Sequence, residues 1–504
     1  MCRNTLGLDS PRAARILEVL TEGGQQVLRL VSTDSFDQQD VKYAALTHCW
    51  GGVDIDAKTT VTNVDQYFTA IDVETLPKTF KEAIRIARAL KLRYLWIDSL
   101  CIVQQYLPDW ERESAKMAAI FRNATLTISA SSAENSTQGC GVSNLLVPST
   151  QFVLPSPAAP GQPRSCIIIR QTTQNPERRP PYLFAEYPIH SRAWIFQEKI
   201  LSRRILHATH GLFLYQCATH IESEDSDWYS ENGSLDSHVP EYMTGHVIPG
   251  ARHHDHVRKL WWSWMRDFSE RQLSKPEDNY AALAGVTDLY RDITGDDPVL
   301  AMWMSDLVVH LAWRADIAAE SRLTHITFPR LERRPTWTWM SYPHGTVRPN
   351  IYSVHFDDLN RAVTPQRLTS TRCYKAEVIG VDIQWTGRPL VTSPSHAIVK
   401  LHGLKSRLSK REFKGSGDFD LDPGIPDPGE DNVYDILALY ANKNEPSLTN
   451  RPWRLHTACL ALEAVNRERN VYRRIGRFLL YDPIAPGKNA EDHLFGTYEE
   501  ITLI

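Results

Sequence analysis

The stretch between residues 76 and 130 constrains the fold more than any other part of the chain. It alternates helical and strand-like patterns in the order helix, strand, loop, helix, strand. Apolar side chains recur at helical spacing in residues 80–90, and Thr79 and Glu82 are spaced as a helix-capping box. The run 94–97 is short, apolar and aromatic, which is typical of a strand buried on both faces. This order predicts an α/β fold in which right-handed crossovers join parallel strands.

Two polar residues follow the strand at 94–97. Asp98 and Ser99 stand directly after its last apolar residue. In an open α/β sheet, ligands bind outside the carboxyl ends of the strands. We therefore expect Asp98 and Ser99 to face a ligand.

The second helix of this stretch contains a carboxylate on its apolar side. If residues 110–124 form one helix, Trp110, Met117 and Phe121 share a face, and Glu113 falls inside that face. A carboxylate there is costly unless it has partners or borders a cavity. Glu113 is therefore either a functional carboxylate or a structural one that reaches the helix edge or pairs with an arginine.

These blocks resemble the fungal heterokaryon incompatibility (HET) domain. The segments that carry the resemblance are YAALTHCWG at 43–51, LPKTFKEAI at 76–84, RYLWIDSLCIVQ at 93–104, DWERESAKMAAIFRNATLTISAS at 109–131 and SRAWIFQEKILSRRILH at 191–207. One departure is Thr47-His48, where a serine followed by tyrosine or histidine is more usual.

The resemblance implies a nonself-recognition or programmed cell-death effector. The HET domain is in turn remotely similar to TIR domains, which have a flavodoxin-like parallel sheet. Some TIR domains cleave the nicotinamide–ribose bond of NAD with a glutamate on a helix after a Trp-Cys pair. Here Trp110 stands three residues before Glu113, and Glu111 occupies the cysteine position. NAD would be a substrate, and no tightly bound cofactor is expected.

The resemblance and the predicted topology together suggest roles for individual residues. Glu113 is the candidate catalytic carboxylate, because a desolvated carboxylate can stabilise an oxocarbenium-like ribose. Asp98 and Ser99 would contact the ribose or a phosphate, and Arg192 the diphosphate. Glu198 is a rival for the catalytic role, although it could instead pair with Arg192, Arg203 or Arg204.

A second class of function stays open. The α/β domain could be a non-catalytic module that forms a homo-oligomer or recruits an incompatibility partner protein, since fold does not decide function. Glu113 separates the two classes: an enzyme needs it to face a pocket, whereas a module could hold it in a salt bridge. A regulatory role beside a biosynthetic gene cluster is neither supported nor excluded.

Composition excludes several other classes. The 504 residues carry a net charge of −4 without a basic stripe, which argues against nucleic-acid binding. No apolar run is long enough for a membrane span, and the N-terminus lacks an apolar signal core. The eight cysteines are scattered, as in a reducing compartment, so a cytoplasmic location is expected.

Two constellations suggest sites that the pattern does not favour. Cys217 and His220 form a Cys-x-x-His without a second ligand pair, so no metal site is predicted. His48 and Cys49 are adjacent on a predicted strand and therefore point to opposite faces, which argues against a catalytic dyad.

The chain is expected to contain four parts. They are an N-terminal β segment at 1–40, the α/β domain at 41–220, a helical subdomain at 221–370 and a β-rich domain at 371–504. Three helices are predicted, at 257–271, 279–290 and 299–313, with the histidine-rich run 253–256 in a loop before them. In the last part, the acidic residues 418–431 are expected to form an exposed loop, and Arg473-Arg474 a solvated pair.

Overall fold

The computed structural model describes most of the chain in separate ranges. These are residues 12–22, 25–36, 41–52, 57–140, 149–153, 166–170, 187–209, 213–217, 220–224, 229–231, 251–317, 330–350, 372–413, 417–427, 429–443, 454–483 and 496–504. Contacts divide the chain into two compact units, one of residues 1–249 with 282–286, and one of residues 250–281 with 287–504. The finer division into four parts stays a prediction.

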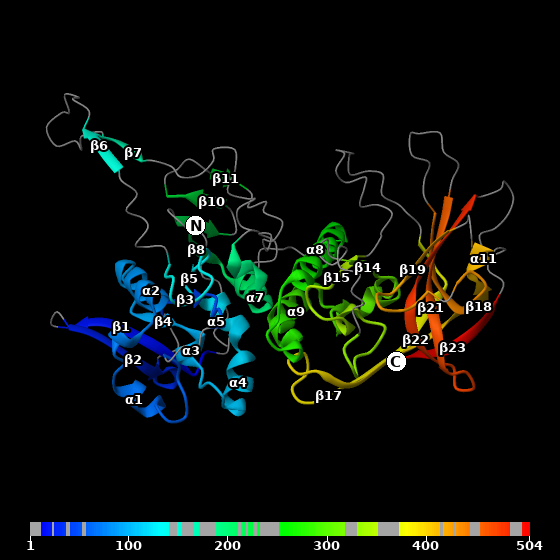
Figure 1. The fold of residues 1–504 in the computed structure, drawn as a ribbon, viewed down its shortest axis with the longest axis horizontal. Coiled ribbons are helices and arrows are strands. Elements are labelled where there is room, and N and C mark those ends of the chain that lie inside the picture. The colour runs from blue at the N-terminus through cyan, green and yellow to red at the C-terminus, as the bar shows by residue number, and fades with distance from the viewer. Residues whose placement is uncertain are drawn as a thin grey trace. The chain divides into compact units, whose positions relative to one another are not determined.

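The first unit contains the predicted α/β alternation (Figure 1). Its elements are β1 (Arg15–Glu22), β2 (Gln25–Ser32), β3 (Tyr43–Thr47), α1 (Val64–Thr69), α2 (Lys78–Ala89), β4 (Tyr94–Trp96), α3 (Asp98–Cys101), α4 (Leu107–Ser114), α5 (Met117–Asn123), β5 (Leu126–Ser129), β6 (Ser149–Val153), β7 (Cys166–Arg170), α7 (Ala193–Leu201), β8 (Arg204–Ala208), β9 (Phe213–Cys217), β10 (His220–Ser223) and β11 (Tyr229–Glu231).

The main sheet of this unit has a parallel centre and antiparallel flanks. Its strand order is β11-β10-β9-β8-β5-β3-β4-β1-β2. β3 pairs in parallel with both β4 and β5, as predicted, and β5 also pairs in parallel with β8. The β1–β2 hairpin joins β4 antiparallel, and β9 to β11 extend the other side antiparallel. The α/β core is confirmed as a mixed sheet with helices.

Helix α2 begins as predicted, but its first turn is not closed by a capping box. Pro77 is the N-cap and offers no side-chain acceptor. The Thr79 hydroxyl instead accepts from the Gly139 N–H at 3.1 Å, and the Glu82 carboxylate accepts from the Cys140 N–H at 2.6 Å. The capping prediction was wrong because both side chains hold a distant segment against the helix.

The predicted helix at 110–124 is two helices. α4 ends at Ser114, and α5 begins at Met117. Between them the chain makes a turn, in which the Lys116 ammonium folds back to the Glu113 carboxylate at 2.9 Å. The single helical wheel therefore does not describe both segments.

The second unit combines helices with a large antiparallel sheet. Its elements are α8 (Ala251–Glu270), most of α9 (Ala281–Thr294), β12 (Pro298–Val299), β13 (Met302–Trp303), α10 (Leu307–His310), β14 (Arg314–Ile317), β15 (Val347–Asn350), β16 (Arg372–Tyr374), β17 (Ala376–Trp385), β18 (Pro394–Ser409), α11 (Lys410–Phe413), β19 (Gly417–Leu421), β20 (Val433–Lys443), β21 (Arg454–Asn466), β22 (Val471–Pro483) and β23 (Thr497–Leu503). The six predicted C-terminal strands are confirmed.

The helical predictions in this unit are confirmed in part. α8 and α9 form where expected, although the histidines at 253–256 lie in α8 rather than in a loop. Residues 299–313 are not one helix, because Leu300 and Ala301 adopt positive φ angles of 48° and 64° and turn the chain into a β12–β13 hairpin. There, a 3-10 turn at Met304–Asp306 leads into the four α-helical residues of α10.

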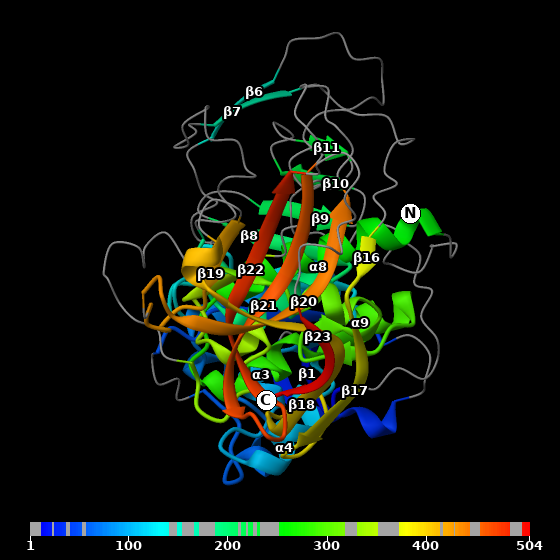
Figure 2. The ribbon, with the colours of Figure 1, turned by 90° about the vertical axis from the view of Figure 1, so that its right-hand side faces the viewer.

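The acidic stretch at 418–431 is not an exposed loop as a whole. β19 pairs with β22, and Asp422 after it is 3% exposed. Arg474 on β22 is 1% exposed and donates to both Asp422 oxygens at 2.9 and 3.1 Å, while its guanidinium lies 3.6 Å from the Trp313 ring centroid. The solvated-pair prediction was therefore wrong for Arg474. Figure 2 shows β20, β21 and β22 side by side in this sheet.

No helix in the described ranges is both long enough and apolar enough to cross a bilayer.

Candidate functional site

The candidate site lies at the carboxyl edge of the parallel strands in the first unit. The four parallel strands lie in the spatial order β4-β3-β5-β8. If they are numbered by their order along the chain, this arrangement is 2-1-3-4. The connection therefore changes direction between β3 and β5. In open α/β sheets, ligands bind in the crevice outside the carboxyl ends at such a switch point.

β3 delivers two polar side chains to this edge. Thr47 and His48 are 4% and 3% exposed, and the Thr47 Oγ1 and His48 Nε2 atoms have no hydrogen-bond partner among the described residues. The chain then leaves the edge through Gly51 and Gly52, whose φ angles are 72° and 66°. A Cβ on Gly51 would lie 2.2 Å from the Asn135 Cβ, so only glycine allows the two segments to approach.

β4 delivers the predicted pair, Asp98 and Ser99. The Asp98 side chain is 25% exposed and accepts from the Trp50 indole at 2.9 Å and from the Ser99 N–H at 2.7 Å. His48 Nδ1 lies 3.9 Å from Asp98 Oδ1. The Ser99 Oγ is buried and has no hydrogen-bond partner in the described part of the chain. The structure thus brings Asp98 and Ser99 together with His48 and Trp50.

Burial keeps the His48 ring and the Cys49 thiol neutral. It lowers the pKa of His48 to about 4, against the opposing influence of the Asp98 charge. It also raises the pKa of the Cys49 thiol, while the nearby Arg192 charge works in the opposite direction. A thiol held protonated is a weak nucleophile, so the geometry does not support a Cys49–His48 dyad.

β5 and β8 add a hydrogen-bonded chain that sequence reasoning missed. Ser131 Oγ lies 3.0 Å from Ser129 Oγ and 3.2 Å from His207 Nδ1, and His207 Nε2 lies 2.7 Å from Gln216 Oε1. Burial lowers the pKa of His207 to about 3, so this ring is neutral at pH 7. Polar residues just after predicted strands were the signal that could have identified it.

α7 places the other predicted residues near the same edge. Arg192 precedes the helix and donates to the His48 carbonyl oxygen. Glu198 is 6% exposed, and its charge acts on the Cys49 thiol by raising the thiol pKa. Arg192 thus binds a backbone atom of the candidate site, while Glu198 is buried near the Cys49 thiol.

Glu113 lies in a different environment, on α4. Its side chain is 0% exposed, and its carboxylate accepts from the Ala14 N–H at 2.8 Å and from Lys116 at 2.9 Å. The Arg112 Nε lies at 3.4 Å. Within the described residues, no hydrogen bond joins Glu113 to Asp98, although the charges of both carboxylates raise the pKa of the buried Cys101 thiol.

A second carboxylate on α4 makes similar contacts. Asp109 is 2% exposed and accepts from Arg15, from Arg112 and, at 2.7 Å, from the Val103 N–H. Together with the Ala14 contact of Glu113, these bonds attach the start of β1 to α4. We call Glu113 and Asp109 with their donors the α4 clamp.

Metal-binding groups were sought throughout the described ranges. No cluster of three or more histidine, cysteine, aspartate or glutamate side chains suited to a metal ion occurs there. Cys217 Sγ instead lies 3.3 Å from His220 Nδ1.

Comparison with known proteins gives one match. The family model described as Heterokaryon incompatibility protein (HET) matches residues 43–198, which include β3 to β5, both carboxylates of the α4 clamp and Glu198. No curated protein and no solved structure matches the chain.

Proposed function

We propose that this chain is an effector of fungal nonself recognition that triggers cell death or growth arrest, because residues 43–198 match the heterokaryon incompatibility family model. The family match carries this proposal. Expression of the chain in a fungal host tests this role directly. An effector should lower viability when it is overexpressed or when its incompatibility partner is present. Full viability at high expression, with and without an incompatible partner strain, would argue against this role.

We propose further that the domain acts as an assembly or recruitment module, and the α4 clamp supports this mode. A catalytic carboxylate must be free to contact the reacting ribose. The Glu113 carboxylate is instead surrounded by Ala14, Lys116 and Arg112. Such contacts suit a residue that holds the N-terminal hairpin in place.

Nucleotide cleavage is the second candidate, and the carboxyl edge supports it. The order β4-β3-β5-β8 agrees with the first four strands of a flavodoxin-like sheet, the arrangement expected for a TIR-like fold. At its switch point, Asp98 is partly exposed, and the buried atoms Thr47 Oγ1, His48 Nε2 and Ser99 Oγ have no hydrogen-bond partner within the described ranges. NAD would bind there, with Arg192 near the diphosphate.

Nicotinamide release separates the two modes. The purified protein is incubated with NAD, both dilute and concentrated, because assembly can complete such a site. Wild type is compared with Asp98→Asn, Glu113→Gln and Glu198→Gln. The module proposal expects no release under any condition. Nicotinamide release by wild type that is lost in only one variant would instead show that the domain is an enzyme, and it would identify the catalytic carboxylate.

A further inference from the structure

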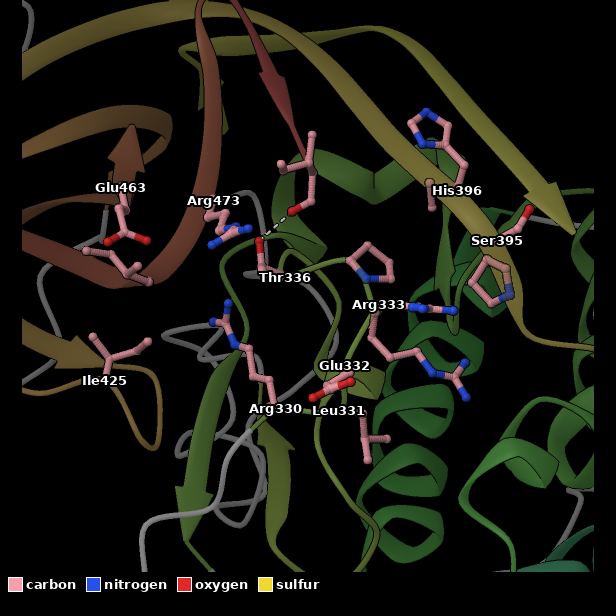
Figure 3. A pocket seen from close by; sticks show the side chains of 16 residues that line it. Arg330, Leu331, Glu332, Arg333, Thr336, Ser395, His396, Ile425, Glu463 and Arg473 are labelled. Atoms are coloured by element: carbon pink, nitrogen blue, oxygen red, sulfur yellow. Dashed lines mark hydrogen bonds between the residues drawn. The ribbon is translucent and has the colours of Figure 1, made fainter. Parts of the chain in front are cut away.

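The second unit contains a pocket that the family match does not reach. Its volume is about 460 Å³, within the usual range for small-molecule sites. The lining side chains come from the segment 330–336, from β18, from the β21–β22 hairpin, and from Ile425 and Ile504 (Figure 3). All of these residues belong to the second unit, so the pocket is complete within it.

The pocket wall has an excess of positive charge. Four arginines and two glutamates line it, namely Arg330, Arg333, Arg334, Arg473, Glu332 and Glu463. Arg330 is engaged, because it donates to the Asp422 carboxylate, to the Tyr342 hydroxyl at 3.0 Å and to a backbone carbonyl. Asp422 also serves the buried Arg474, so two guanidinium groups share one carboxylate behind the wall.

Two of the other three arginines, Arg333 and Arg473, retain donors that a ligand could reach. Arg333 and Arg473 are exposed, and in the described part of the chain no ion pair or hydrogen bond engages their side chains. Arg334 is half-buried with its guanidinium 5.0 Å from the Tyr280 ring centroid, and its buried Nη1 has no hydrogen-bond partner among the described residues. This nitrogen is closed to solvent and therefore offers no donor to a ligand in the pocket as the structure stands.

The backbone of this segment is also held in an uncommon conformation. Arg333 has a φ of 59°, the left-handed region that non-glycine residues rarely adopt. Thr336 anchors the end of the segment, since its N–H and its hydroxyl donate to the Ile504 carbonyl at 3.1 and 2.6 Å. Strained residues held by their surroundings cluster at ligand sites.

We infer that this pocket binds a small phosphate-bearing anion. Guanidinium groups form paired, charge-assisted hydrogen bonds with phosphate oxygens, and the two exposed arginines, Arg333 and Arg473, match a ligand with two or more negative charges. The wall also contains apolar side chains, among them Leu331, Ile425 and Ile475, which could contact an organic group attached to the phosphates.

Calorimetric titration of the full chain with inorganic pyrophosphate, and separately with ATP, tests this inference. The double variant Arg333→Gln/Arg473→Gln should bind about 10- to 100-fold more weakly than wild type. The matched control Lys400→Gln/Arg469→Gln removes two exposed positive charges of the same unit outside the pocket and should bind as wild type does. Tighter binding of ATP than of pyrophosphate would indicate a nucleotide, and equal binding a free polyphosphate.

A second variant changes affinity in the opposite direction. Glu463 is an exposed wall carboxylate whose β21 position is paired with Arg473 on β22. Glu463→Gln removes a competing negative charge and should strengthen binding by a few fold, which is the size of effect that a surface ion pair usually has. Absence of binding to wild type at millimolar anion would overturn the inference, as would equal affinity of wild type and the double variant.

Discussion

Replacing Glu113 by glutamine tests whether the α4 clamp is structural. The wild-type carboxylate accepts three donors, from Ala14, Lys116 and Arg112, and its side chain is fully buried. Glutamine keeps one acceptor oxygen of similar size, so it can retain the Ala14 bond but not the charge-assisted bonds. Lys116 is 22% exposed and can turn to water, which limits the loss.

The expected cost follows from these contacts. Loss of the charge-assisted bonds corresponds to about 2–3 kcal/mol of unfolding free energy. Glu113→Ala also leaves the Ala14 N–H without an acceptor and opens a cavity, so it should cost about 3–5 kcal/mol. Glu111→Gln, on the exposed side of the same helix, is the matched control and should change stability by less than about 0.5 kcal/mol.

Urea denaturation followed by tryptophan fluorescence measures these differences. A catalytic carboxylate is often unfavourable for stability, so its replacement is neutral or stabilising. A structural clamp residue behaves in the opposite way. If Glu113→Gln were as stable as wild type, the clamp interpretation would be refuted, and the residue would return as the first candidate for catalysis.

Three further predictions concern stability. Gly51→Ala should cost more than Gly52→Ala by about 1–3 kcal/mol in urea denaturation, because both glycines have positive φ but only a Cβ at Gly51 meets neighbouring atoms; equal costs would contradict the close approach. Asp422→Asn should cost about 3–5 kcal/mol, because it leaves the buried Arg474 charge uncompensated, and an unchanged denaturation midpoint would contradict this. The pKa of His207 is lowered from 6.5 to about 3, so the unfolded chain binds a proton more readily than the folded one. The contribution of His207 to the free energy of unfolding is therefore full above pH 6.5 and falls as the pH drops, by about 2 kcal/mol at pH 5. A His207→Gln variant should lose that part of the pH dependence, and an unchanged profile would contradict the assignment.

Local patterns predicted the α/β core well, because its determinants lie within single elements. The buried strand at 94–97 and the N-terminal β segment before β3 are identified by a few consecutive residues. The features that sequence analysis missed or misjudged depend on contacts between residues far apart in the chain. Ser131 and His207 are 76 residues apart, and Asp422 and Arg474 are 52 apart, so no window of sequence shows that they meet.

The helical errors have a different physical origin. Residues 299–313 have a helical apolar pattern, but Leu300 and Ala301 take left-handed backbone angles that no local pattern predicts for these residue types. The hairpin that results is held by the Trp303 N–H, which donates to His310 Nδ1 at 3.1 Å. Tertiary contacts thus outweighed helix propensity, which is a weak determinant by itself.

The contrast between Glu113 and Asp98 bears most directly on mechanism. Glu113 is fully enclosed by donors of the chain itself, so a substrate could reach it only if the α4 clamp opened. Asp98 has two donors and a quarter of its side chain exposed, at the strand edge where ligands bind in such sheets. Any nucleotide chemistry by this domain should therefore depend on Asp98 before Glu113, and the order of activity loss in the two variants tests that ranking.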